Sequence, residues 1–99
     1  MKGDQISLDD FITINQDVIF RDLDGEAVIL NIETSVYFGL NEVGTRIWNL
    51  VHQHGSLQKV CEIMGEEYEV APEVLERDLL QLVGLLCAKG LASVSPPQA

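Results

Sequence analysis

The stretch Val36-Tyr37-Phe38-Gly39-Leu40-Asn41-Glu42-Val43-Gly44-Thr45-Arg46-Ile47-Trp48 decides the fold, because the spacing of its apolar residues changes from that of a strand to that of a helix. Before Asn41, the residues Val36, Phe38 and Leu40 alternate with others, which is typical of a strand with one inward face. Asn41 is a favourable helix N-cap. We therefore predict a strand over 36–40, at or near the edge of its sheet, followed directly by a helix that ends near Gln53.

Three further strands are predicted upstream of this junction. The segments 11–14 and 18–21 are rich in β-branched and aromatic residues and are separated by turn-prone Asn15-Gln16-Asp17. Asp24-Gly25 predicts a two-residue hairpin turn, followed by a strand over 27–32 in which Val28, Leu30 and Ile32 share one face.

Downstream of the junction, the apolar residues predict three helices. The first helix has an apolar stripe formed by Val43, Ile47, Leu50 and Val51. The second helix starts after Ser56 and stops at Gly65, and its stripe is formed by Leu57, Val60, Cys61 and Met64. The third helix runs from Pro72 to about Lys89, and its core stripe is formed by Leu75, Leu79, Leu82, Val83 and Leu86. An extended segment follows over 91–94. This order predicts an α+β fold: a winged helix-turn-helix with a small N-terminal antiparallel three-stranded sheet and three helices, over 11–94, between a flexible N-terminus (1–10) and a flexible tail (95–99).

The composition of the chain disfavours some classes of function. The chain has 99 residues, 16 acidic and six Lys or Arg residues, and a net charge of −10, which describes one small acidic domain. This charge opposes nucleic-acid binding, and the third helix offers Glu73, Glu76 and Asp78 where a recognition helix would present basic or amide groups. Positively charged peptides or proteins are easier partners. Because we find no signal peptide or long apolar stretch, we expect a cytoplasmic protein that is not in a membrane.

The sequence offers no convincing catalytic or metal site. His52 and His54 are two residues apart in a predicted helix, so they do not share a face and are not arranged as metal ligands. Cys61 and Cys87 are isolated within apolar helical stretches, where a thiol is unreactive. We predict a protein that is not an enzyme and has no metal or cofactor.

A binding function is better supported. Leu80, Gly84 and Cys87 form a second apolar track on the third helix, outside its core stripe. This track could pack beneath the sheet, pack in a homodimer, or form one side of a peptide groove. In the last case, strand 36–40 would accept an extended peptide along its free edge.

The aromatic strand ending in Leu40-Asn41, the glycine at Gly44, the Ile47-Trp48 pair, and the final helix with Asp78, spaced leucines and Gly90-Leu91 together resemble the PqqD family. The resemblance covers about residues 11–94. It implies a winged-helix domain that binds the leader segment of ribosomally synthesised precursor peptides and delivers it to a modifying enzyme. That enzyme is a radical SAM protein in pyrroloquinoline quinone (PQQ) biosynthesis and a leader peptidase in lasso-peptide pathways.

By this resemblance the leader pairs with the third strand of the sheet and rests against the third helix. On this sequence the expected peptide-binding residues are Val36, Tyr37, Phe38, Gly39, Glu76, Leu80, Gly84 and Cys87. We expect structural roles for three other residues of the pattern: Gly44 allows close backbone packing, Trp48 anchors its helix to the sheet, and Asp78 pairs with Arg46 or accepts a hydrogen bond from a turn. A winged-helix regulator or a dimerisation domain without peptide binding remains the alternative.

Overall fold

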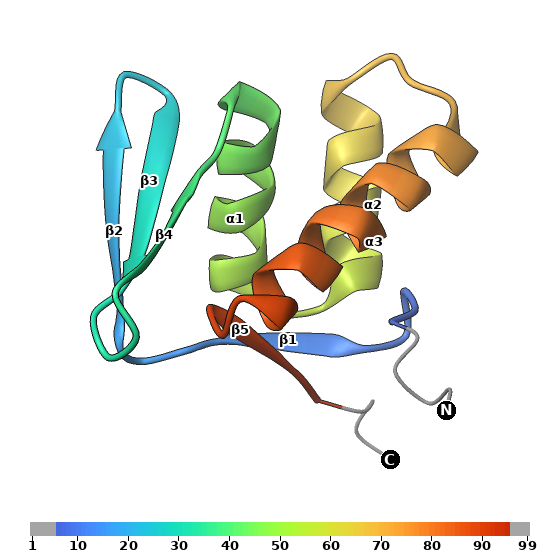
Figure 1. Ribbon diagram of the computed structural model, residues 1–99. Coiled ribbons are helices and arrows are strands. Elements are labelled where there is room, and N and C mark those ends of the chain that lie inside the picture. Colours follow the sequence, from blue (N-terminus) through green and yellow to red (C-terminus); the bar gives the residue numbers. More distant parts are fainter. Residues whose placement is uncertain (1–5, 96–99) are drawn as a thin grey trace.

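The computed structural model describes residues 6–95 and shows an α+β fold with antiparallel sheets and three helices (Figure 1). The elements follow the order β1 (Phe11–Ile14), β2 (Val18–Leu23), β3 (Glu26–Asn31), β4 (Val36–Gly39), α1 (Glu42–His54), α2 (Leu57–Glu67), α3 (Pro72–Ala88) and β5 (Ala92–Ser95). The sheet of β2, β3 and β4 lies on one side of α1, and α2 and α3 lie on the other (Figure 1).

The strands form two separate sheets. In the larger one the order is β2-β3-β4, so that β3 is central and β2 and β4 are edges. The first strand, β1, pairs instead with β5 after the last helix, with Phe11 opposite Ser95 and Ile14 opposite Ala92. The predicted extended segment after the third helix is therefore present, and its partner is the first strand of the chain.

The Asp24-Gly25 turn has the predicted hairpin geometry. Leu23 pairs with Glu26 across it, and both turn residues have positive φ, 64° at Asp24 and 88° at Gly25. Positive φ at both positions defines a type I′ turn, whose twist matches that of the flanking strands. The Asp22 carboxylate also accepts a hydrogen bond of 2.7 Å from the Gly25 N–H group.

The buried face of β3 is the opposite of the apolar face found in the sequence. Ala27, Ile29 and Asn31 are buried, whereas Ile32 is 54% exposed and Val28 and Leu30 are half-buried. The sequence pattern misleads here because the inward face contains one small and one polar residue.

The polar residue on that face, Asn31, can be buried because both its amide oxygen and its amide nitrogen form hydrogen bonds. Its side-chain oxygen accepts hydrogen bonds from the backbone N–H groups of Glu33 and Thr34, and its side-chain nitrogen donates to the Gly90 carbonyl at 2.9 Å. Buried polar groups persist where such partners are available. Asn31 thereby joins the sheet to the end of α3.

Thr45 joins α1 to the sheet through hydrogen bonds of its side chain. Its hydroxyl accepts a hydrogen bond of 2.8 Å from the Ala27 N–H group and donates at 3.5 Å to the Leu40 carbonyl, while the Leu40 N–H group donates to the Ala27 carbonyl. Thr45 is itself only 4% exposed. A side chain of α1 thus completes the hydrogen bonding between β3 and the end of β4.

The helix boundaries agree with the sequence except at Gly65. Asn41 caps α1 by accepting a hydrogen bond from the Gly44 N–H group, and Ser56 caps α2 in the same way. However, α2 continues through Gly65 to Glu67, so the predicted stop is wrong. Gly65 has no positive φ, and a Cβ atom on it would lie 3.9 Å from Leu75, which places this glycine where α3 passes close to α2.

One core connects these elements. It is formed by buried apolar side chains from three strands, the three helices and the segments that follow β4 and α3, namely Ile12, Ala27, Ile29, Leu40, Ile47, Trp48, Leu50, Val51, Leu57, Val60, Met64, Leu75, Leu79, Val83, Leu86, Leu91 and Ala92. Trp48 stacks on Phe20 with ring centroids 6.0 Å apart, which confirms its role as the anchor between helix and sheet.

Two other structural expectations need correction. A Cβ atom on Gly44 would lie 3.2 Å from the Leu40 side chain and 3.3 Å from the Asn41 cap, so it is neighbouring side chains rather than another backbone that pack closely there. Arg46 pairs with Glu67 instead of Asp78. The hydrogen bonds between them raise the pKa of Arg46 and lower the pKa of Glu67.

The segment before β1 packs onto the domain. Asp10 closes a turn with Ser7 through both its backbone and its carboxylate, and Ile6 and Leu8 lie half-buried against the core. The flexible ends predicted at 1–10 and 95–99 fall partly on residues 1–5 and 96–99, which lie outside the described residues. Within 6–95, none of the helices combines the length and apolar character needed to span a bilayer.

Replacing Thr45 by valine tests the junction. The change keeps the side-chain shape but leaves the buried Ala27 N–H group without an acceptor, which costs about 1–3 kcal/mol of unfolding free energy. Urea denaturation followed by circular dichroism measures this loss. Thr45→Ser retains the hydroxyl and serves as the control: an equal loss in both variants would contradict the role of the hydrogen bond.

Candidate functional site

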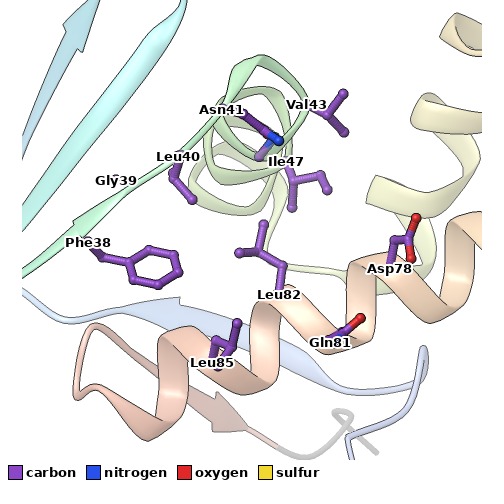
Figure 2. Close-up of a pocket in the computed structure, with 11 residues that line it drawn as sticks. Phe38, Gly39, Leu40, Asn41, Val43, Ile47, Asp78, Gln81, Leu82 and Leu85 are labelled. Atoms are coloured by element: carbon purple, nitrogen blue, oxygen red, sulfur yellow. The ribbon is translucent and has the colours of Figure 1, made fainter.

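A groove runs between β4, the start of α1 and one side of α3 (Figure 2). Its volume is about 460 Å³. It is lined by Phe38, Gly39, Leu40, Asn41, Val43, Gly44, Ile47, Asp78, Gln81, Leu82 and Leu85. Figure 2 shows Phe38 at one end, Asp78 at the other and Leu82 between them.

One side of the groove is an unpaired strand edge. Hydrogen-bonded pairs alternate along an antiparallel ladder. Since Leu40 bonds to Ala27, the other bonded pairs are Phe38 with Ile29 and Val36 with Asn31. The backbone groups of Tyr37 and Gly39 therefore point away from β3, and within residues 6–95 no strand pairs with them.

The outward face of β4, on the side opposite the buried Ile29, is open. Tyr37 is 70% exposed, and no atom lies within 4 Å of the position that a Cβ atom on Gly39 would take. Gly39 therefore leaves the outward face of β4 uncovered by a side chain at this position.

The other side of the groove is apolar and partly accessible. Val43 and Leu85 are 41% and 46% exposed, and Leu82 is half-buried. Val43 belongs to the apolar stripe predicted for the first helix and Leu82 to the core stripe predicted for the third, but both side chains line the groove. Their signal in the sequence is the same as that of core residues, so periodicity alone could not separate them.

The eight predicted binding residues fall into two groups. Val36, Tyr37, Phe38 and Gly39 form β4, and the last two line the groove. On α3, the groove is lined instead by Asp78, Gln81, Leu82 and Leu85.

Glu76, Leu80, Gly84 and Cys87 lie on a different side of α3. At 100° per residue, Leu80 is about 160° around the helix from Leu82. Leu80 and Cys87 pack half-buried against the core, Glu76 is exposed, and Gly84 has no neighbouring atom within 4 Å of its Cβ position. The structure therefore brings Phe38 and Gly39 of the predicted set to the groove and leaves the helix half outside its lining.

Charges mark the two ends of the groove. Asp78 is the one carboxylate in the lining, and its Oδ1 atom is 3.7 Å from Nε of Arg77 on the same helix. At the opposite end, the Lys89 ammonium lies 5.7 Å from the centre of the Phe38 ring, in a cation–π contact.

The arrangement supplies contacts suited to binding. The edge offers backbone donors and acceptors, and the groove offers apolar contact. The two thiols lie outside the groove lining, and burial raises the pKa of both Cys61 and Cys87, which favours the unreactive thiol form. Among residues 6–95, His, Cys, Asp and Glu side chains form no group of three that could hold a metal ion.

Two solved structures have a similar architecture. One similar structure is described as "TbiB1 in Complex with the TbiA(beta) Leader Peptide": it is 33% identical, has a TM-score of 0.78, and the match covers 82% of this chain and 94% of that one. Another is described as "Lasso peptide synthetase B1 complexed with the leader peptide", with 26% identity, a TM-score of 0.75, and coverage of 83% and 96%. No curated protein matches at a comparable level.

The family model described as "Coenzyme PQQ synthesis protein D (PqqD)" matches residues 26–92. This range runs from the first residue of β3 into the start of β5 and includes both sides of the groove. It accounts for more than half of the chain. The chain belongs to the PqqD family.

Proposed function

We propose that this protein binds the leader segment of a ribosomally synthesised precursor peptide by adding it as a strand to β4. The observation that carries the proposal is the unpaired backbone of Tyr37 and Gly39 beside an apolar groove. Strand addition obtains affinity from main-chain hydrogen bonds and specificity from pockets for alternate side chains.

The two structural neighbours support this proposal, since both are complexes with leader peptides. We infer that the protein acts without catalysis and presents its peptide to a modifying enzyme, such as a radical SAM protein or a leader peptidase. Because a ribosomally made precursor first becomes available in the cytoplasm, we place the protein there.

In the proposed complex, the peptide lies between β4 and α3. Its backbone bonds to Tyr37 and Gly39, and the side chains on its inner face enter the groove beside Leu82 and Leu85. The net charge of −10 attracts basic peptides over a longer range. The helix contact is thereby assigned to the side of α3 that lines the groove, and the side with Leu80 becomes a test surface.

We also assign a winged-helix arrangement to α2, α3 and the β1–β5 ribbon. The turn between α2 and α3 and the short strand after α3 support this assignment. A regulatory role on DNA is not favoured, because α3 exposes Glu73, Glu76 and Asp78 and the chain is strongly acidic.

Gly39→Pro tests strand addition. Proline removes the backbone N–H group that points away from β3, and edge strands tolerate proline at such positions. Loss of one main-chain hydrogen bond to the peptide should weaken binding by about three- to tenfold. The measurement is isothermal titration of the TbiA(β) leader peptide, with amide shifts at 36–40 locating the site.

Gly84→Ala is the control for that variant. Its new methyl group meets no atom within 4 Å, and alanine favours the helix, so the variant should bind like the original protein. If neither the TbiA(β) leader nor the leader of this protein's own precursor shifts the amides at 36–40, strand addition to β4 is refuted.

A matched pair of leucines tests which side of α3 faces the peptide. Leu85→Ala removes an apolar side chain of the groove and should weaken leader binding by about fivefold, because roughly 1 kcal/mol of apolar burial is lost. Leu80→Ala should lower the free energy of unfolding but leave affinity unchanged, since Leu80 packs on the core. The reverse result would transfer the contact to the side with Glu76, Leu80, Gly84 and Cys87.

A further inference from the structure

The larger sheet has a second unpaired edge, at β2. The Ile32 N–H group donates to the Asp17 carbonyl at 2.9 Å, so the bonded pairs along the β2–β3 hairpin are those of Asp17, Ile19, Arg21 and Leu23. The backbone groups of Phe20 and Asp22 therefore point away from β3. Among the described residues no strand pairs with this side of β2, which lies at the outer margin of the fold in Figure 1.

A second cavity lies beneath this edge, between β2, β1 and the end of α1. Its volume is about 560 Å³, larger than that of the groove beside β4. Phe20, which is 36% exposed, and the buried Trp48 form one wall with their stacked rings. In an added antiparallel strand, the residue opposite Phe20 would point to the same face as Phe20 and enter this cavity.

The lining of this cavity is uncharged, unlike the strongly acidic protein as a whole. Its lining contains no Asp, Glu, Lys or Arg, although the chain has 16 acidic residues. Its polar side chains are a hydroxyl, three amides and two imidazoles, from Thr13, Asn15, Gln16, Gln53, His52 and His54. The charged residues Arg21 and Asp22 lie on the half of β2 nearer the hairpin turn, beyond the lining.

This lining favours one kind of occupant. An uncharged segment loses no ion pair and meets no repulsion in such a cavity, whereas a basic peptide finds no carboxylate there. A second copy of this chain would bring another ten negative charges to the interface. An aromatic side chain suits the volume and could stack near Phe20, as aromatic anchors do at interface hot spots.

We propose that β2 is a second strand-docking edge, which takes an extended, uncharged segment of a partner protein and inserts its aromatic side chain beside Phe20 and Trp48. β3 separates this edge from β4, so one sheet can hold the precursor on one side and the partner on the other. The protein would then join two polypeptides through the same mechanism.

The single tryptophan makes the proposal testable. Trp48 lines the β2 cavity but not the β4 groove, so a change in its emission reports occupancy of the former. A display library of random twelve-residue peptides is selected on the full chain, and each binder is mapped by amide shifts. We expect a class of uncharged, aromatic binders that shift residues 18–22, change Trp48 emission and leave 36–40 unshifted.

Two matched phenylalanines provide the variants. Phe20→Ala should weaken this class by about tenfold and leave the TbiA(β) leader unaffected, and Phe38→Ala, the equivalent change beside the other edge, should do the reverse. Val18→Phe, which adds bulk to the cavity from β2 without adding a second tryptophan, should also block the class. It is the alternative variant if Phe20→Ala does not fold.

The proposal is overturned if every binder maps to 36–40, if no binder is obtained, or if the binders at 18–22 are charged and lack aromatic residues. Shifts at 18–22 that depend on protein concentration alone, with a rising mass, would show self-association instead of partner binding. Leader binding is measured at different amides, so it can fail or hold independently of these results.

Discussion

The structure depends on the packing of β3 against α1, where the buried Ala27 N–H group donates a hydrogen bond to the Thr45 hydroxyl. This bond fixes the central strand rather than either edge. The inward face of β3 is consequently buried at Ala27, Ile29 and Asn31, and the two neighbouring strands form the edges of the sheet. A cavity remains under each edge, at Phe38 and at Phe20.

This arrangement explains how so small a domain can bind a peptide. A chain of 99 residues has a limited core, and a deep pocket would remove part of the apolar burial that stabilises it. A strand edge needs no such pocket, because its unpaired backbone groups are already at the surface. The cost of an exposed edge is the risk of aggregation, which the short strand β4 and the charges of Arg21 and Asp22 on β2 limit.

Three sides of α3 have different surroundings. The side with Leu75, Leu79, Val83 and Leu86 is buried in the core; the side with Asp78, Gln81, Leu82 and Leu85 lines the groove; and the side with Glu76, Leu80, Gly84 and Cys87 lies away from it. All three sides contain apolar residues. Hydrophobic spacing therefore predicts the helix and most of its core. It cannot identify which remaining side faces β4, since that depends on how α3 packs against elements distant in the sequence.

The sequence by itself determined the elements and the class of the fold. Local signals were sufficient for this: the Asn41 cap, the Asp24-Gly25 turn and the two spacings on either side of Leu40 depend only on nearby residues. It also identified β4 as an edge and Trp48 as an anchor. Only the tertiary structure decided the pairing of β1 with β5, the inward face of β3 and the groove side of α3. Each of these depends on partners distant in the chain, as when Asn31 is buried because it can donate to the carbonyl of Gly90.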